Sequence, residues 1–376
     1  MTTIAINGRF LSQKVTGVQR FAAEITRAAA ALAASGDWPT VHLLRPPGEA
    51  ADPPGLPTQT FGRLRGQAWE QWELPRRARG SLLLSLGNTA PLLAGRRQAV
   101  VLHDAGVFDT PESYSAPFRA WYRTLHFALP RCGARLLTVS EFSRGRLAHH
   151  LRIDPARFGV VHEGAEHILR QPADPGVLAR HGLAADGFVL VVGSRAAHKN
   201  LAGLRDAAGL LAARGLTLAV VGGAAAGVGV GGAAAGVGVG GAAAGGVFRA
   251  AAAPGSQAVA ALGRATDAEL RALYEAARCL VFPSRYEGFG LPPLEAMACG
   301  CPVLSAPAGA VPEICGDAAL WFDADGPRAL PAVLARLLDE PGLAHDMRRR
   351  GLERAAPYSW RRAAETLLRL LPDTGP

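Results

Sequence analysis

Two carboxylates, Glu287 and Glu295, occur in the segment "CLVFPSRYEGFGLPPLEAMACG", and their surroundings suggest ligand binding. The apolar run before them predicts a strand that ends near Ser284. Pro292 and Pro293 suit the first turn of a helix, where a missing N–H costs little. Glu287 is therefore expected in a strand-to-helix loop and Glu295 in the first turns of the helix. Because a helix N-terminus carries partial positive charge and free donors, the segment predicts an anion site.

Two glycines in the same loop, Gly288 and Gly290, would let backbone N–H groups come close to a ligand. A purely structural role is the alternative, with Glu295 complementing the helix dipole and Glu287 in a surface turn. The combination of a strand, a glycine-containing loop and a proline-started helix favours a functional site.

A basic cluster, "VVGSRAAHKNL", follows a second predicted strand that ends at Gly193. Arg195, His198 and Lys199 fall in the loop or at the start of the next helix. Arg195 and Lys199 are spaced to converge on one face, as a diphosphate clamp requires. The alternative is two solvated bases, but cations at a helix N-terminus are disfavoured unless an anion is present.

Two weaker signals lie in the first half of the chain. His103 and Asp104, in "VVLHDAG", follow a predicted strand at the end where open α/β sheets bind ligands, and a structural role for His103 stays open. Gly17 opens a helix predicted over 18–34, where it leaves room for a phosphate or sugar near the N–H groups. Thr16 and Gln19 are expected to form a capping box there.

Three further patterns are interpreted as structural. The sequence "GGAAAGVGV" at 222–230 recurs at 231–239, and residues 222–245 are expected to form an expanded, mobile loop. The repeat matches the G-x-G-x-x-G motif of dinucleotide-binding sites, but the helix and the acidic residue that such a site needs do not follow it. Asp323 and Asp325 fit an ordinary turn better than a metal site. Of the five cysteines, Cys299 and Cys301 have no partner pair at zinc-site spacing, and these two and Cys279 are expected to be small core residues.

Composition excludes some partners. The chain has 376 residues and a net charge of +9, from 40 Lys+Arg against 31 Asp+Glu. This balance suits phosphates, nucleotides or anionic lipid, and a solvated arginine-rich surface is the alternative. The scattered basic residues, without interleaved aromatics, argue against nucleic acid. The N-terminus lacks signal-peptide features and no run has the character of a membrane span, so a cytoplasmic location is expected and any membrane contact would be peripheral.

Short apolar runs without alternation recur along the chain and predict strands buried on both faces of parallel sheets. One series runs from "TIAIN" to "FGVVHEG" and a second from "FVLVVGS" to "CPVLSA", with helical patterns between them. The predicted fold class is α/β, with two doubly wound domains. The segment 171–187 is rich in the turn-forming residues Pro, Gly and Asp, which places the boundary there between a first domain, 1–175, and a second, 176–356.

With these clusters in order, the chain resembles a retaining glycosyltransferase of family 4, of the type found in bacterial surface-polysaccharide gene clusters. The most specific likeness is the E-x7-E motif formed by Glu287 and Glu295; "LHDAGVF", "TVSEFSR", "VGSRAAHKN" and "YSWRRAAETLL" also fit in order. The resemblance implies the GT-B fold, in which two Rossmann-like domains face each other across a cleft. It places the nucleotide sugar mainly on the second domain, the acceptor mainly on the first, and a C-terminal helix within 357–376 that crosses back to the first.

The resemblance also implies a role for each matched residue. Arg195 and Lys199 would hold the diphosphate, Glu287 the donor-sugar hydroxyls and Glu295 the ribose. The remaining implied contacts are His103 to the sugar at the reacting centre, Gly17 to phosphates and acceptor, and Gly193, Phe289, Gly290 and Leu291 to the donor.

The function expected from this resemblance is transfer of a hexose, with mannose as the candidate, from a nucleoside diphosphate sugar to a glycan or polyprenyl-diphosphate-linked glycan. No metal and no other cofactor are expected. The alternatives are a nucleotide-sugar-binding protein without catalysis and a GT-B sugar-nucleotide epimerase. A retaining glycosidase is disfavoured because Glu287 and Glu295 belong to different local elements and the basic cluster would be unexplained.

Overall fold

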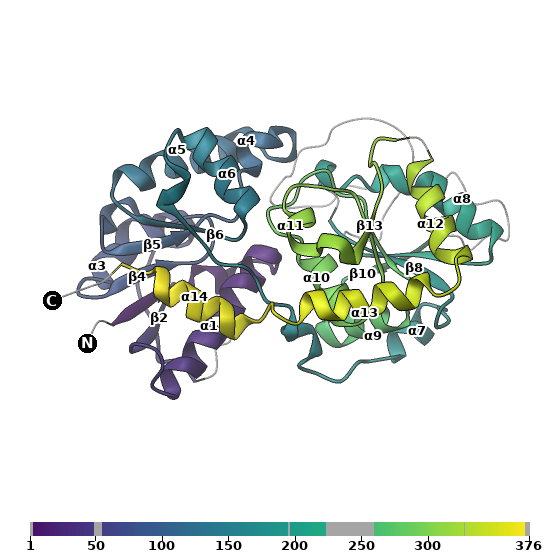
Figure 1. The fold of residues 1–376 in the computed structure, drawn as a ribbon. Helices are drawn as coiled ribbons and strands as arrows, with labels where there is room; N and C mark the ends of the chain where they lie inside the picture. Colours follow the sequence, from purple (N-terminus) through teal and green to yellow (C-terminus); the bar gives the residue numbers. More distant parts are fainter. Residues whose placement is uncertain (1–2, 49–54, 195, 223–258, 327, 373–376) are drawn as a thin grey trace. The chain divides into compact units, whose positions relative to one another are not determined.

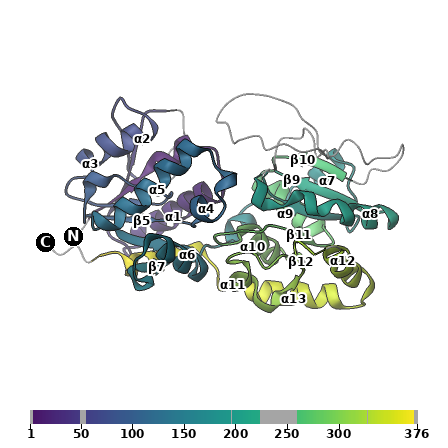
Figure 2. The ribbon, with the colours of Figure 1, turned by 90° about the horizontal axis from the view of Figure 1, so that it is seen from above.

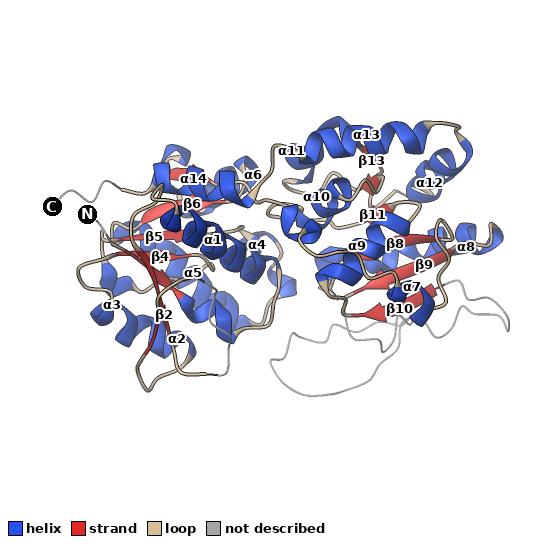
Figure 3. Cartoon of the chain, turned by 90° about the horizontal axis from the view of Figure 1, so that it is seen from below, coloured by secondary structure: helices blue, strands red, loops and turns tan. Residues whose placement is uncertain are grey.

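The computed structural model describes residues 3–48, 55–194, 196–222, 259–326 and 328–372 (Figure 1). The chain divides into two compact units. The first comprises Met1–Asp109, Ala116–Gly164 and Tyr358–Pro376, and the second comprises Thr110–Ser115 and Ala165–Pro357. Each unit contains one sheet with helices on both of its faces, as the red strands and blue helices of Figure 3 show. The α/β fold class predicted from the sequence is confirmed.

The first unit is built on a seven-stranded sheet in the order β3-β2-β1-β4-β5-β6-β7, and all paired strands are parallel. Its strands are β1 (Ile4–Asn7), β2 (Val41–Arg45), β3 (Thr58–Thr60), β4 (Leu82–Ser85), β5 (Gln98–Val101), β6 (Arg135–Thr138) and β7 (Phe158–Val160). Every residue of β1, β4 and β5 is buried, which explains why these strands appear as continuous apolar runs.

Helices cover both faces of this sheet (Figure 1, Figure 2). They are α1 (Gly17–Ala34), α2 (Gly66–Ala68), a π-helical turn (Trp69–Glu73), α3 (Leu74–Arg77), α4 (Gly106–Asp109), α5 (Ala116–Arg131), α6 (Glu141–Leu151) and α14 (Trp360–Leu370). The C-terminal helix α14 packs against α1, with the ring of Trp360 5.9 Å from that of Phe21. The last segment of the chain is therefore part of the first unit.

The second unit contains a six-stranded parallel sheet in the order β10-β9-β8-β11-β12-β13. Its strands are β8 (Phe188–Val192), β9 (Thr217–Val221), β10 (Val259–Gly263), β11 (Leu280–Phe282), β12 (Val303–Ser305) and β13 (Ala319–Trp321). Val189 and Leu190, neighbours in β8, point to opposite faces of the sheet. Both are fully buried, because helices cover both faces.

The helices of the second unit are α7 (Gly176–Arg180), α8 (Arg205–Ala213), α9 (Asp267–Ala276), α10 (Leu291–Ala298), α11 (Val311–Cys315), α12 (Ala329–Asp339) and α13 (Leu343–Ala355). Helices α8 and α12 share an apolar core with Val189, Val191 and Leu304 of the sheet. Helices α9 and α10 lie on the opposite side of the sheet (Figure 1).

The structure differs from the sequence-based expectations at several places. The chain enters the second unit at Ala165, whereas the predicted boundary lies after residue 175. The reason is that the 3-10 helix Glu166–Leu169 packs against α9 and α10, so these residues belong to the second core. The short segment 110–115 also joins the second unit, where Ser113 Oγ lies 3.1 Å from His198 Nδ1.

Local details differ as well. Thr16 is the N-cap of α1, but its hydroxyl donates to the side chain of Gln19 instead of accepting from the helix backbone, so the predicted capping box is not formed. Strands β2, β3 and β10 had not been predicted. The repeat at 222–245 lies outside the described residues apart from Gly222.

Candidate active site

The main cluster of predicted site residues lies at the carboxyl edge of the second sheet. Strands β8 and β11 are parallel neighbours, with Leu190 opposite Leu280, so the segments that follow them leave the sheet at the same edge. The segment after β8 passes Gly193 and reaches the 3-10 helix Ala197–Lys199. The segment after β11 carries Glu287. Ligands of open parallel sheets bind at this edge.

Lys199 and Glu287 form the central contact of this cluster. Lys199 Nζ lies 2.6 Å from Glu287 Oε1, and the side chains are 19% and 11% exposed. The ammonium group is also 5.7 Å from the ring centroid of Phe282, the last residue of β11. The structure thus joins the cation predicted to hold a diphosphate to the carboxylate predicted to hold a sugar.

Backbone contacts hold the loop of Glu287 in place. Arg285 N donates to His198 O at 2.7 Å, and Ala310 N donates to Glu287 O at 3.0 Å. Gly309, at φ +59°, passes so close that a Cβ there would lie 2.2 Å from Glu287 O. Only glycine permits this approach without moving the loop.

Helix α10 begins where the sequence predicts, but its N-terminus differs from the expected anion site. Gly290 is the N-cap at φ 109°. Pro292 and Pro293 have no N–H, so Leu291 is the only one of the first three helical residues that can donate a backbone hydrogen. The prolines fix the start of the helix, but they also remove two of the donors that an anion would use.

Glu295 is held inside the second unit by two side chains. His167 Nε2 lies 2.8 Å from Glu295 Oε1, and the Tyr274 hydroxyl donates to Oε2 at 3.1 Å. Glu295 is 6% exposed, and His167 and Tyr274 are buried. Within the described residues, no hydrogen bond or ion pair joins Glu295 to Lys199 or Glu287.

Burial, together with the neighbouring carboxylate of Glu295, raises the pKa of Tyr274 well above its ordinary value. The phenol therefore stays protonated at neutral pH and remains a donor to Glu295. A buried Tyr hydroxyl needs such a partner, so the two residues fix each other's rotamers.

Neither partner of Glu295 was predicted from the sequence. His167 follows the last strand of the first series, in "HEGAEHIL", where a lone polar residue gave no pattern to recognise. Tyr274 lies near Leu273 on the buried part of α9, and its hydroxyl on an apolar helix face was a usable signal.

The basic cluster is described in part. Arg195 lies outside the described residues, so the clamp it was predicted to form with Lys199 stays a prediction. Lys199 lies in a 3-10 helix in the segment between β8 and α8, which begins at Arg205, so of the two expected positions it takes the loop and not the start of the α-helix. Gly193 adjoins Lys199, because a Cβ on Gly193 would lie 4.0 Å from the Lys199 Cβ.

His103 and Gly17 lie in the first unit. His103 follows β5, is 4% exposed, and its Nε2 lies 2.9 Å from Leu86 O. Its Nδ1 lies 3.9 Å from Glu163 Oε1, and its ring meets Phe21 edge-on at 4.8 Å. Phe21 belongs to α1, which begins at the exposed Gly17, where a Cβ would meet no atom within 4 Å.

Other candidate groups have structural environments. Asp325 N donates to Asp323 Oδ1 at 3.0 Å, the turn predicted for this segment. Within the described ranges, no three His, Cys, Asp or Glu side chains are grouped so that they could hold a metal ion. Cys279 and Cys301 are buried and Cys299 is half-buried; burial raises the pKa of Cys279 to about 12.

None of the helices in the described part of the chain has the length and apolar character that a membrane crossing requires.

The known proteins that this chain resembles are glycosyl transferases. Residues 180–354 match the family described as Glycosyl transferases group 1. O-antigen chain mannosyltransferase B of Escherichia coli is 32% identical over 274 residues, which cover 70% of this chain and 67% of that protein. The serotype-specific mannosyltransferase WbdA of Escherichia coli is 35% identical over 102 residues, 27% of this chain and 12% of WbdA.

The fold also resembles solved structures. HepE of Anabaena, in complex with UDP-glucose, has a TM-score of 0.69 at 15% identity, with 98% of both chains covered. At this identity the likeness concerns the fold, which is GT-B.

Proposed function

Since the chain belongs to the group 1 glycosyl transferases, we propose that it moves a hexose from a nucleoside diphosphate sugar to a glycan acceptor in polysaccharide synthesis. The proposed sugar is mannose, transferred with retention of anomeric configuration. The proposed acceptor is a glycan, free or linked to a polyprenyl diphosphate. The enzyme class is that of a hexosyltransferase.

The names of the relatives support these choices. One relative is an O-antigen chain mannosyltransferase and another a serotype-specific mannosyltransferase, which favours mannose and a surface polysaccharide. HepE holds UDP-glucose, which favours a nucleoside diphosphate sugar as donor. The net charge of +9 suits a phosphorylated donor and a lipid-diphosphate acceptor, and it supports peripheral contact with an anionic membrane.

The observation that carries the proposal is the contact between Lys199 and Glu287 at the carboxyl edge of the sheet. As the bond to the anomeric carbon breaks, negative charge grows on the diphosphate. An ammonium group that is already in place stabilises this charge without reorganisation, an effect of about 3–4 kcal/mol for one group. Glu287 can accept hydrogen bonds from sugar hydroxyls while it orients Lys199.

Retention is proposed to follow from attack on the face from which the diphosphate leaves. A phosphate oxygen of the departing group would take the proton of the acceptor hydroxyl, so no protein base is needed. Lys199 would stabilise the leaving group throughout, and no metal is included in this proposal. The buried His103 would contribute by contact with the donor sugar.

Glu295 is proposed to bind the ribose of the donor. An ionised carboxylate has about four lone-pair sites, and His167 and Tyr274 occupy two of them. The remaining two can accept ribose hydroxyls, and the two partners hold the carboxylate in one orientation for that purpose.

The experiment is a panel of GDP-, UDP- and ADP-sugars, tested first for binding by calorimetry and then for transfer to a mannose-terminated oligosaccharide. We expect the sugar nucleotides of one base to bind with dissociation constants in the micromolar to millimolar range, and we expect sugar transfer that depends on the acceptor. Binding of a nucleotide sugar without turnover on any acceptor would support a binding protein instead. Conversion of the sugar in the absence of acceptor would support an epimerase.

A further inference from the structure

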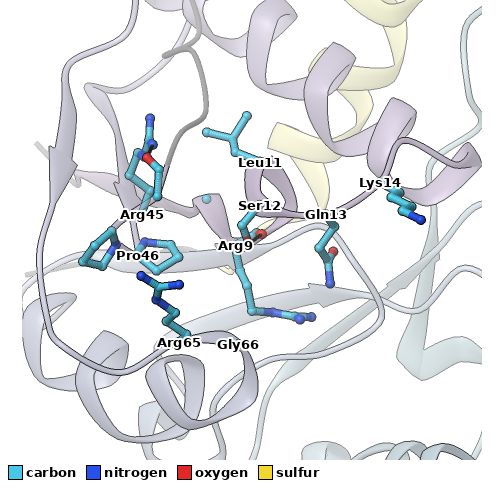
Figure 4. Close-up of a pocket in the computed structure, with 12 residues that line it drawn as sticks. Arg9, Leu11, Ser12, Gln13, Lys14, Arg45, Pro46, Arg65 and Gly66 are labelled. Carbon is cyan, nitrogen blue, oxygen red and sulfur yellow. Dashed lines mark hydrogen bonds between the residues drawn. The ribbon is translucent and has the colours of Figure 1, made fainter. Parts of the chain in front are cut away.

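A pocket of about 660 Å³ lies entirely within the first unit, and none of its lining residues was given a role in the function proposed above. It is formed by the segments that follow β1 and β2, which are adjacent parallel strands, together with the start of α2. Ligands of doubly wound sheets bind at this carboxyl edge. In Figure 4, Arg45, Pro46 and Arg65 lie on one side of the pocket, Arg9 and Ser12 at its centre, and Gln13 and Lys14 on the other side.

The lining of the pocket is strongly cationic. Arg9, Lys14, Arg45 and Arg65 line it, and none of its described lining residues is Asp or Glu. Arg9 is paired with the buried Glu70, and the other three positive side chains give the concave surface an excess of positive charge that an anion would offset. The composition of the pocket therefore selects for a negatively charged ligand.

The innermost cation is held rigidly. Arg9 is buried, its Nε donates to Glu70 Oε1 at 3.1 Å, and its Nη2 donates to Thr89 Oγ1 at 2.6 Å. Asn7 Nδ2 donates to the same Glu70 oxygen at 2.6 Å. This network uses part of the guanidinium and fixes its plane, so Arg9 is pre-organised and its association with a ligand would cost little side-chain entropy.

The outer cations are in the opposite situation. Lys14 and Arg65 are exposed, and across the described ranges neither forms an ion pair or a side-chain hydrogen bond. Gln13 Oε1 accepts a hydrogen bond from Gln19 Nε2 at 2.9 Å, so the amino group of Gln13 is the end left to donate. The pocket thus combines the fixed Arg9, two exposed cations and a neutral donor with Arg45, whose Nη2 donates to Gly48 O.

We propose that this pocket binds a phosphate or diphosphate ester. Guanidinium groups match phosphate oxygens in bidentate geometry, and several converging donors suit a group with many acceptor oxygens. The volume exceeds that of an inorganic phosphate and lies in the range of small-molecule sites, and Leu11, Pro46 and Pro47 offer apolar surface for the organic part. The ligand is the phosphorylated end of the acceptor; this identification rests on the proposed function.

The test is calorimetric titration of the full chain with inorganic pyrophosphate. The double variant Lys14→Gln/Arg65→Gln removes two exposed charges that support no other contact. The control is Arg63→Gln, which removes an exposed charge that does not line the pocket. We expect two classes of pyrophosphate site in the wild type, one of which weakens about tenfold or more in the double variant and is unchanged in the control.

Lys199→Ala separates this inference from the proposed function, because it should weaken only the other class of site, in the second unit. In transfer assays the double variant should raise KM for a phosphorylated acceptor and leave KM for the donor unchanged. The ligand source is distinguished by comparing a soluble sugar phosphate with a short prenyl diphosphate. Equal pyrophosphate isotherms for the wild type and the double variant would overturn the proposal. So would binding to phosphatidylglycerol vesicles without any binding of pyrophosphate, which would indicate a diffuse basic surface.

Discussion

Lys199 and Glu287 neutralise each other across 2.6 Å, so under the proposed function a bound donor would have to replace this ionic contact with contacts of its own. The diphosphate would take over the ammonium group, and the sugar hydroxyls would take over the carboxylate. Both side chains are mostly buried, which strengthens the pair relative to a surface salt bridge and holds each group near the place where it is needed.

Replacement of Lys199 by Ala is expected to reduce kcat by about two to three orders of magnitude, because the growing charge on the leaving group loses its cation. Glu287→Gln should raise KM for the donor, since a neutral amide accepts weaker hydrogen bonds from the sugar hydroxyls than a carboxylate does. The measurement is steady-state kinetics with thermal unfolding in parallel. Arg214→Gln, which breaks an exposed pair with Asp339, serves as the control and should leave kinetics unchanged. Near-normal kcat in Lys199→Ala would remove this residue from the mechanism.

A buried histidine makes the stability of the first unit depend on pH. Burial lowers the pKa of His126 in α5 from 6.5 to about 4, and its Nε2 contacts Asn88 O at 3.2 Å. Its Nδ1 is buried and has no hydrogen-bond partner among the described residues, so a proton there would be unsatisfied.

Because the folded-state pKa of His126 is below the unfolded value, the unfolded chain takes up the proton first as the pH falls. Stability is therefore lost between about pH 6.5 and pH 4, and the loss between pH 7 and pH 5 should be about 2 kcal/mol. Urea unfolding at these two pH values measures it. His126→Gln, which keeps a donor and does not titrate, should flatten the pH dependence by that amount. An unchanged slope in this variant would contradict the assignment.

At the scale of elements, the position of Glu287 depends on a turn that precedes another helix. Gly309 lies just before α11, and the backbone there passes against the carbonyl of Glu287. The loop that carries Glu287 and the start of α11 are thus held together, in part by the hydrogen bond from Ala310 N to Glu287 O.

Gly309→Ala should lower transfer activity strongly, because its Cβ would lie 2.2 Å from Glu287 O and force the loop to move. A stability loss of about 1–3 kcal/mol is expected from backbone strain at positive φ together with the clash. Gly300→Ala is the matched control. It has a similar φ of +69°, but its Cβ would approach only Leu352, at 3.9 Å. It should lose stability and keep activity. Equal activity in the two variants would mean that the loop adapts.

At the scale of the whole molecule, the end of the chain returns to the first unit. Trp360 is 2% exposed, and α14 packs against α1, the helix that begins at Gly17 and contacts His103 through Phe21. The first unit is therefore incomplete until the chain has been synthesised to its C-terminal helix.

Trp360→Ala should destabilise the first unit by about 3–5 kcal/mol, as expected for removal of a buried aromatic side chain. Scanning calorimetry with two transitions would show one shifted to lower temperature, while binding of the nucleoside diphosphate to the second unit persists. Arg361→Gln, next to it and exposed, should shift neither transition. A shift of both transitions by Trp360→Ala would show that the two units unfold as one.

Much of the fold could be predicted because it is encoded locally. Runs such as "LLLS" and "VLVV" are apolar on both faces, and that pattern alone predicts a strand in a parallel sheet. Pro292, Pro293 and the glycines around them likewise fixed the start of α10. Strands β3 and β10 were missed because they lie at sheet edges, where burial no longer imposes an apolar pattern.

The candidate site could be predicted as a set of residues but not as a set of contacts. Short-range periodicity and the rule that parallel strands share a carboxyl edge were enough to bring Lys199 and Glu287 to the same edge. The sequence by itself also determined the family. Only tertiary packing decided that His167, 128 residues away in the sequence, contacts Glu295. The same holds for the salt bridge between Arg9 and Glu70 and for the unit to which each segment belongs. The physical reason is that propensities act over a few neighbouring residues, whereas the partner of a buried charge is chosen by whichever distant side chain the completed core places within reach.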